Sequence, residues 1–281
     1  MKINFAQECN SLTKRQASTH KGDYGHVCII GAGQSAYSGA VCLAGSAALR
    51  GGAGLVSAIV HPSALVLMNR APAELMCYAS ATPSDGTLDT FIEKATVIVL
   101  GPGLTQSEWA VEFFNKITRL EVPIVLDADA LNILAQHSAT SSSLKRDNWI
   151  LTPHAGEAAR LLGVTPEYIQ NNRIESIERL EEKWGGVVIL KGMGTLVYTK
   201  AHPLMECAAG NPGMASGGMG DVLAGLIGSL LAQGLSSWSA AKLAVIVHAM
   251  AGDRQQVFGQ TGMLASDLLL EFRALLNFKH E

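Results

Sequence analysis

Short runs of consecutive apolar residues recur along the chain and alternate with longer segments whose apolar residues follow a helical period. The runs are His26–Ile30, Leu55–Val60, Val97–Leu100, Ile124–Leu126, Trp149–Leu151 and Val187–Leu190. Strands that are covered by helices on both faces have near-continuous apolar sequences of this kind. The pattern therefore predicts an α/β fold with a mainly parallel central sheet.

The helical pattern lies between these runs and fills the C-terminal third of the chain. We expect helices over Gly39–Arg50, Glu108–Arg119, Ala155–Leu162, Ile174–Lys183, Asp221–Leu231, Ser239–Phe258 and Ala265–Phe278. Gly194–Ala209 contains a Thr-Leu-Val-Tyr-Thr run that predicts an antiparallel hairpin at the sheet edge. The polar segment Ser138–Ser143 is short enough to be a surface loop. No repeat or linker divides the chain, so we expect residues 1–281 to form a single domain.

Composition and charge narrow the class of protein. The chain has 281 residues, 16% of them charged, with 29 glycines and a net charge of −3, which is typical of a compact fold with many tight turns. The 21 basic and 24 acidic residues form no basic cluster, which argues against a nucleic-acid partner. The five scattered cysteines predict reduced thiols. With no signal peptide and no bilayer-length apolar run, we expect a cytoplasmic protein without a membrane partner.

The loop after the first apolar run has two interpretations. Gly31-Ala-Gly33-Gln-Ser-Ala36 formally matches the dinucleotide fingerprint of Rossmann-type oxidoreductases. The acidic residue expected after the next strand is missing, because that strand is followed by His61 and Pro62. The small residues Ser38-Gly39-Ala40 then open a helix and let backbone N–H groups approach a ligand. The oxidoreductase is therefore the weaker alternative.

Ligands in an open α/β sheet bind at the carboxyl ends of the strands, and polar residues follow several predicted strands there. Asp127 and Asp129 follow one strand, and their carboxylates suit a metal ion, although Asp127 could also cap the next helix. His154 opens a helix after Thr152-Pro153, and we expect it to contact a ligand. Glu157 fits a helix cap or a metal site.

Lys191 is the polar residue that follows the last of the predicted parallel strands. It precedes Gly192 and Gly194, an arrangement that suits the approach of a phosphate group, with the hydroxyl of Thr195 as an additional donor. The same residues would also fit a plain entry into the hairpin.

The most specific pattern is a glycine-rich stretch, Asn211-Pro-Gly-Met-Ala-Ser-Gly217-Gly218-Met-Gly220-Asp221, that leads into an apolar helix. Its backbone N–H groups and the helix dipole favour a bound anion, so we expect a phosphate site. Asp221 is either an N-cap or a base aimed at a hydroxyl beside a transferable phosphoryl group. The glycines favour the base.

Together these motifs resemble those of one enzyme family. Lys21-Gly-Asp-Tyr-Gly25, Tyr37-Ser-Gly-Ala40, Gly101-Pro-Gly-Leu104, Leu126–Asn132, Thr152-Pro-His154, Lys191-Gly-Met-Gly-Thr195 and the glycine-rich stretch occur in the same order in the ADP/ATP-dependent NAD(P)H-hydrate dehydratases. The resemblance covers nearly the whole chain, as far as Asp253. It implies a three-layer ribokinase-like fold and repair of hydrated NADH and NADPH.

The resemblance also implies roles for individual residues. Gly218, Gly220 and Asp221 would be catalytic. The hydrated dinucleotide would contact Ala40, Gly103, His154 and Asp221. The nucleotide would contact Lys191, Gly192, Met193, Gly194, Thr195 and Gly220. Asp127 and Glu157 are candidate metal ligands. The sequence departs from the family pattern at Ala155, which is usually proline, and at Thr105, which is usually glycine.

The predicted reaction makes hydroxide a better leaving group by phosphorylation. Asp221 would take the proton of the ring hydroxyl, the terminal phosphoryl group of ADP or ATP would move across the Gly217–Gly220 amides with Mg²⁺ bridging, and the ring nitrogen would expel phosphate. ADP is the preferred nucleotide by resemblance to bacterial members. The expected partners are an NAD(P)H-hydrate epimerase on a separate chain and further copies of this chain, as a tetramer.

Two other functions stay open from the sequence. A kinase of a small hydroxymethyl or hydroxyethyl heterocycle would use the same loop and the same base but would release the phosphorylated alcohol. A non-catalytic nucleotide sensor would have no reason to keep both Asp221 and the glycines.

Overall fold

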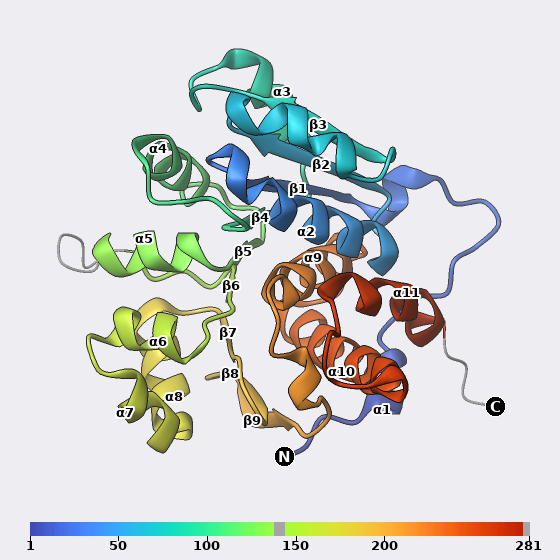
Figure 1. The fold of residues 1–281 in the computed structure, drawn as a ribbon, viewed down its shortest axis with the longest axis vertical. Helices are drawn as coiled ribbons and strands as arrows, with labels where there is room; N and C mark the ends of the chain where they lie inside the picture. The colour runs from blue at the N-terminus through green and yellow to red at the C-terminus, as the bar shows by residue number, and fades with distance from the viewer. Residues whose placement is uncertain (138–143, 278–281) are drawn as a thin grey trace.

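The structure, a computed structural model, describes residues 1–137 and 144–277. The predicted loop Ser138–Ser143 and Phe278, the last residue of a predicted helix, lie outside the described residues. A nine-stranded sheet with the order β3-β2-β1-β4-β5-β6-β7-β8-β9 runs through the molecule (Figure 1). The strands are β1 (His26–Gly31), β2 (Leu55–Val60), β3 (Leu75–Ala79), β4 (Val97–Leu100), β5 (Ile124–Leu126), β6 (Trp149–Leu151), β7 (Val187–Leu190), β8 (Thr195–Thr199) and β9 (His202–Cys207).

The sheet is parallel from β3 to β7, and β8 and β9 pair antiparallel at one edge. The predicted mainly parallel sheet and the predicted edge hairpin are therefore confirmed. The strand β3 is an addition, because the sequence pattern did not indicate it.

Helices cover both faces of the sheet and give three layers (Figure 1). One layer contains α1 (Phe5–Cys9), α2 (Ser38–Gly51), α9 (Met219–Ala232), α10 (Ser237–Gln255) and α11 (Ala265–Leu276). The other contains α3 (Gly86–Lys94), α4 (Glu108–Ile117), α5 (Asp129–His137), α6 (Ala155–Leu162), α7 (Pro166–Asn171) and α8 (Arg173–Trp184). Short 3₁₀ helices cover Lys21–Tyr24, Ser35–Tyr37, Pro62–Arg70, Pro212–Met214 and Gln256–Phe258. Every predicted helix is present, with ends that shift by at most about one turn.

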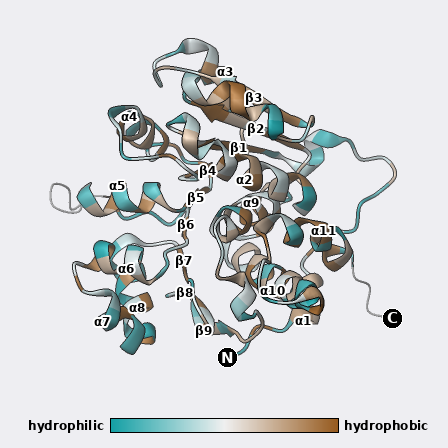
Figure 2. Ribbon diagram, in the orientation of Figure 1, coloured by the Kyte–Doolittle hydropathy of each residue, from teal (hydrophilic) through white to brown (hydrophobic). Residues whose placement is uncertain are grey.

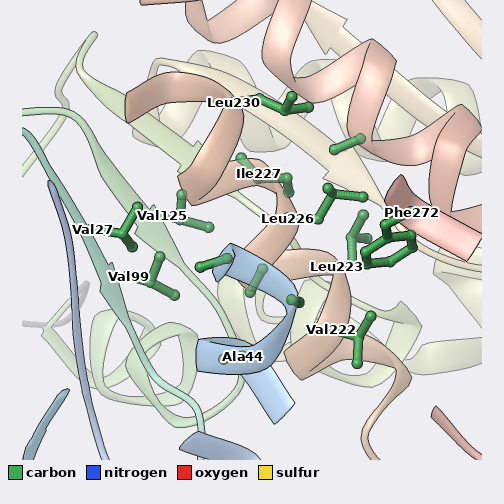
Figure 3. Close-up of a cluster of buried hydrophobic side chains, with 14 of the residues drawn as sticks. Val27, Ala44, Val99, Val125, Val222, Leu223, Leu226, Ile227, Leu230 and Phe272 are labelled. Atoms are coloured by element: carbon green, nitrogen blue, oxygen red, sulfur yellow. The ribbon is translucent and has the colours of Figure 1, made fainter. Parts of the chain in front are cut away.

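Helix α9 is the most deeply buried helix, because its residues are apolar or small on every side. All residues from Val222 to Ala232 are buried. Figure 3 shows Leu223, Leu226 and Ile227 among side chains from β1, β4 and β5 on one side and from α2 and α11 on the other. A helix that is apolar all round belongs in a core. This packing fixes the position of the N-terminus of α9 relative to the strand ends.

The hydropathy of the chain follows the layers (Figure 2). Hydrophobic residues concentrate along the strands and in the helices next to α9, whereas α7 and α8 carry many hydrophilic residues. Within residues 1–137 and 144–277, no helix has both the length and the apolarity that a bilayer span requires.

The chain order of the strands marks the place where a crevice for ligands is expected in this kind of sheet. From β1 the chain passes to β2 and β3 on one side of β1, and it returns to β4 on the other side. In such sheets ligands bind at the carboxyl ends of the strands, where the order reverses.

Candidate active site

Two loops meet where the strand order reverses, after β1 and after β4. The N–H groups of Ala32 and Gly33 donate hydrogen bonds to the carbonyl oxygens of Pro102 (3.0 Å) and Gly103 (3.0 Å). A Cβ atom on Gly33 would overlap the Leu104 carbonyl oxygen, so the loops can pair only with glycine at this position. The fingerprint-like glycines therefore serve loop packing, which argues against the Rossmann alternative.

Ala40 and Gly103, both predicted to contact the dinucleotide, lie side by side at this crevice. A Cβ atom built on Gly103 would lie 3.3 Å from the Cβ atom of Ala40. Helix α2 starts at Ser38, and no side chain in the described part of the chain caps its N-terminus. The N–H of Ser38 donates to the Ser35 carbonyl oxygen, so the N–H groups after Ser38 in the first turn are the ones that a ligand could meet.

Lys191 lies among carboxylates at the ends of β5, β6 and β7. Its Nζ atom is 2.7 Å from Asp127 Oδ1 and 3.9 Å from Glu157 Oε2. Thr152 Oγ1 also donates to Asp127 Oδ1 (2.6 Å). Asp127 and Glu157 are almost fully buried, and the Lys191 side chain is 18% exposed. The alternative that Asp127 caps the next helix is wrong, because its carboxylate contacts Lys191 and Thr152.

The N-terminus of α9 reaches the same cluster. A Cβ atom built on Gly220 would lie 3.2 Å from Lys191 Nζ and 3.5 Å from Asp127 Oδ2. The N-cap is Gly218, which has a φ of 91° and makes no side-chain cap. Asp221 is the third residue of the helix, so the N-cap alternative for Asp221 is wrong. Uncapped N–H groups, an ammonium group and a carboxylate therefore converge at one point.

The acidic groups of this cluster outnumber its basic groups. Burial raises the pKa of Asp221 to about 7, and the nearby Asp127 carboxylate adds to the rise. Burial likewise raises the pKa of Glu157 to about 7, although Lys191 works against this rise. Burial alone would lower the pKa of Lys191, but Asp127 and Glu157 outweigh it, so that pKa is raised. One ammonium does not neutralise three carboxylates, and the site is poised to hold or release a proton near neutral pH.

His154 and Glu157 form a capping box at the start of α6. His154 Nδ1 accepts from the N–H of Gly156 (3.0 Å), and the N–H of His154 donates to Glu157 Oε2 (2.8 Å). Glu157 is therefore the cap residue that the sequence indicated. Because Nδ1 accepts, the ring proton is on Nε2, which lies 3.3 Å from Glu157 Oε1. The side chain of His154 is 55% exposed and can meet a ligand.

The predicted nucleotide loop connects β7 and β8. Its first residue is tied to the crevice, because the N–H of Lys191 donates to the Pro153 carbonyl (2.9 Å). Met193 is fully exposed, so its side chain is not packed against the rest of the loop. The Thr195 hydroxyl donates to the Gly192 carbonyl (2.9 Å) and closes the loop. In this conformation the hydroxyl donates within the loop, and its role as a donor to a phosphate stays a prediction.

Arg173, at the start of α8, holds that loop and was not predicted. Its guanidinium donates to the carbonyl oxygens of Leu190 (3.1 Å), Gly194 (3.2 Å) and Lys191 (3.4 Å). Three bonds from one planar group fix the curvature of the loop. No sequence signal marks this residue, because its partners are backbone atoms.

Asp253, near the end of α10, holds the glycine-rich stretch in a similar way. Its carboxylate accepts from the N–H of Gly210 (2.9 Å) and from Asn211 Nδ2 (3.0 Å). Asn211 Oδ1 in turn accepts from the N–H of Gly213 (3.0 Å). The Asn211 side chain therefore shapes the start of the stretch that leads to α9.

Backbone strain is concentrated at the same edge of the sheet. In the described residues, the non-glycine positions with positive φ are Ala32 (47°), Thr105 (64°) and Ala128 (48°). They follow β1, β4 and β5. The usual family residue at position 105 is glycine, and this φ explains that preference. The N–H of Thr105 donates to Asp129 Oδ2 (2.9 Å), which supports this conformation. Strain of this kind is often found at functional sites.

Comparison with known families decides between the open alternatives. The sequence pattern of the NAD(P)H-hydrate dehydratase family matches residues 27–273. This chain belongs to that family. It is 36% identical over 270 residues to the ADP-dependent (S)-NAD(P)H-hydrate dehydratase of Neisseria meningitidis, covering 94% of this chain and 88% of that protein.

Longer relatives and a solved structure extend the comparison. The bifunctional NAD(P)H-hydrate repair enzyme Nnr of Coxiella burnetii is 47% identical over 267 residues, covering 95% of this chain and 53% of that protein. The chain thus spans about half the length of such relatives. The ADP/ATP-dependent NAD(P)H-hydrate dehydratase of Bacillus subtilis, co-crystallised with ATP/Mg²⁺, has a TM-score of 0.83 at 24% identity, covering 98% of this chain and 96% of that one. The fold is ribokinase-like, as predicted.

Proposed function

We propose that this protein uses an adenine nucleotide, ADP in preference to ATP, to dehydrate the S form of 6-hydroxylated NADH and NADPH. The observation that carries the proposal is the position of Asp221 directly after Gly220, the residue that brings the uncapped N-terminus of α9 next to Lys191 Nζ. The ADP-dependent relative from Neisseria meningitidis supports the choice of nucleotide.

The geometry supports the following roles for the residues. The N–H groups at the start of α9 and the Lys191 ammonium would stabilise the transferred phosphoryl group. The Asp221 carboxylate would take the proton of the ring hydroxyl as its oxygen bonds to the terminal phosphorus and the bond to AMP breaks. The ring nitrogen lone pair then expels phosphate, and loss of a proton from the neighbouring ring carbon restores the double bond.

Asp127 holds Lys191 rather than reacting. Its carboxylate is bonded to both Lys191 Nζ and Thr152 Oγ1, which fixes the ammonium next to Gly220. His154, Ala40 and Gly103 line the acceptor side. The loop from Lys191 to Thr195, braced by Arg173, would hold the nucleotide, and Met193 would contribute only its backbone.

Mg²⁺ fits this set of residues as part of the nucleotide complex. In the part of the chain that the structure describes, no three or more His, Cys, Asp or Glu side chains are arranged to hold a metal ion alone. Mg²⁺ usually takes one or two carboxylates and completes its shell with water and substrate phosphates. Asp127 and Glu157 would supply those carboxylates, and the ion would offset the excess negative charge and neutralise phosphate charge.

The test measures the two products of the reaction, reduced nicotinamide and phosphate. Purified protein is mixed with hydrated NADH, ADP and Mg²⁺, and the absorbance of reduced nicotinamide and the release of phosphate are recorded together. We expect equal amounts of both products, no reaction without nucleotide, and a rate about 1,000-fold lower for Asp221→Asn, which keeps the shape but lacks the base. Near-normal turnover by that variant would reject the role of Asp221.

The same assay separates the competing kinase. A kinase of a small alcohol would consume nucleotide with hydroxyethylthiazole-like acceptors, release no phosphate and leave hydrated NADH unchanged. We further propose that residues 1–281 act as one catalytic domain, that an NAD(P)H-hydrate epimerase is the functional partner, and that the chain forms a homo-oligomer.

A further inference from the structure

A chain of polar contacts crosses the acceptor side of the crevice and ends at an arginine. The Asp129 carboxylate accepts from the N–H of Thr105 through Oδ2 (2.9 Å) and from Asn132 Nδ2 through Oδ1 (3.2 Å). Asn132 Oδ1 then accepts from Arg160 Nη1 (2.9 Å). Arg160 is on α6, and Thr105 directly follows the Gly101–Leu104 turn. Arg160 is therefore connected to both elements that carry the substrate residues Gly103 and His154.

Arg160 differs from the other cations of the site in its partners. Lys191 forms an ion pair with Asp127, and the guanidinium of Arg173 donates its hydrogen bonds to backbone carbonyl oxygens. Arg160 is exposed, its contact is the neutral amide of Asn132, and no carboxylate in residues 1–137 or 144–277 forms an ion pair with it. The Asn132 amide orients one nitrogen of the Arg160 guanidinium. The positive charge and the remaining N–H groups of that guanidinium stay available to a ligand.

The charge of Arg160 acts on the substrate side of the site. Partial desolvation lowers the pKa of His154, and the charges of Lys191 and Arg160 lower it further. The substrate is a dinucleotide that carries phosphate groups, whereas Asp127, Asp129, Glu157 and Asp221 make the crevice negative. A phosphate bound near His154 needs an unpaired cation, and Arg160 is oriented to supply one.

We infer that Arg160, oriented by Asn132, binds a phosphate group of the hydrated dinucleotide and so contributes to substrate recognition. This inference rests on the proposed function. The phosphate is either part of the pyrophosphate, which NADH and NADPH share, or the 2′-phosphate, which only NADPH carries. Arg160 does not touch the reacting atoms, so it acts on binding and not on the chemical step.

The test compares Arg160→Gln with wild type for hydrated NADH, hydrated NADPH and ADP. We expect the KM of a hydrated dinucleotide to rise about tenfold, because a charge-assisted hydrogen bond is lost. The KM of ADP and kcat should stay within about twofold, since phosphoryl transfer occurs elsewhere. A rise for both dinucleotides identifies the pyrophosphate, and a rise for hydrated NADPH alone identifies the 2′-phosphate.

Two variants control this experiment. Arg160→Lys keeps the charge and should recover part of the affinity, which a loss of packing would not explain. Arg119→Gln removes an exposed arginine at the end of α4 and should behave like wild type. An unchanged KM for both dinucleotides in Arg160→Gln overturns the inference.

A direct binding measurement separates failure of this inference from failure of the proposed function. NADPH and NADH are titrated into wild type and Arg160→Gln, and their fluorescence is recorded. If wild type does not turn over hydrated NADH, the proposed function fails. Weaker binding by Arg160→Gln would still support the phosphate contact, and equal binding by the two proteins would refute it.

Discussion

Buried polar groups have different surroundings at the amino ends and at the carboxyl ends of the central strands. At the amino end of β1, Nε2 of buried His26 shares a hydrogen bond with Ser57 Oγ (2.8 Å), and the backbone N–H of His26 donates to Thr96 Oγ1 (2.9 Å). At the carboxyl ends, Asp221 and Glu157 share one ammonium group with Asp127, and burial raises the pKa of Asp221 and of Glu157 to about 7.

The difference indicates that the fold is less stable at the carboxyl ends of the strands, where the candidate active site lies. His26, Ser57 and Thr96 at the amino end are neutral and hydrogen-bonded to one another, so they hold the strands together. Groups at the carboxyl ends carry uncompensated charge and a strained backbone, which lowers stability and, in the proposed function, supplies a base and an anion site. If this comparison is correct, changes at the two ends must respond to pH with opposite sign.

The largest expected effect on stability is at the carboxyl end. Because burial raises the pKa of Asp221 from 3.8 to about 7, the folded state keeps this proton to a higher pH than the unfolded state does, and wild type loses stability as the pH rises through that interval. Asp221→Asn should therefore be more stable than wild type by about 2 kcal/mol at pH 8. The difference should vanish below about pH 4, where both states of wild type are protonated.

Urea unfolding of both proteins between pH 4 and pH 8 measures this difference. The variant should gain stability over wild type while it loses activity, which is the trade expected of a functional group. A wild type that is the more stable protein at pH 8 would mean that the Asp221 carboxylate is stabilised by its surroundings, and the comparison of the two ends would fail.

Much of the architecture was predictable, because it follows from apolar periodicity. The parallel strands and the long helices were located from local patterns alone. The edge strand β3 was missed because its residues are mostly half-buried and carry no continuous β-branched run. The short helices α1, α3 and α7 were missed as well, and no bounds were predicted for α5, since helices of nine residues or fewer give few apolar repeats.

The site was predictable residue by residue but not as a network. Asp127, Lys191 and Asp221 each follow from a position at a strand end or a helix start. That Lys191 lies between Asp127 and Glu157 depends on side-chain directions that a linear pattern does not contain. The roles of Arg173 and Asp253 were out of reach, because each braces a loop that is distant in sequence, Arg173 through backbone carbonyls and Asp253 through one backbone N–H and one side-chain amide.

A smaller effect of opposite sign is expected at the amino end. His26→Leu removes the partner of Ser57 Oγ and should cost about 1 kcal/mol at pH 8, while activity stays within about twofold. Burial lowers the pKa of His26, although a hydrogen bond to the Lys94 backbone works against this. The unfolded state therefore binds a proton first as the pH falls, and wild type loses stability below about pH 6.5.

The cost of His26→Leu should consequently shrink as the pH falls from 8 to 5, because the variant has no proton to bind there. The same urea titrations measure it beside Asp221→Asn. A cost that grows toward low pH, or a large loss of turnover, would show that the amino end is not a purely structural region.

The smallest effect concerns the strained residue between the two aspartates. Ala128 has a φ of 48°, which places the start of α5 directly after Asp127. Glycine adopts this angle without the steric penalty of about 1 kcal/mol, but it also makes the unfolded chain more flexible by a similar amount. Ala128→Gly should therefore change the free energy of unfolding by less than about 0.5 kcal/mol.

Ala128→Val is the informative counterpart. A β-branched side chain resists this φ, so the variant should lose about 2 kcal/mol of stability and displace Asp127 from Lys191. Turnover should then fall for Ala128→Val and stay near wild type for Ala128→Gly, since Lys191 and Thr152 still fix the Asp127 carboxylate in the glycine variant. If Ala128→Gly also lost activity, the alanine itself and not the turn that it makes would be what the site requires.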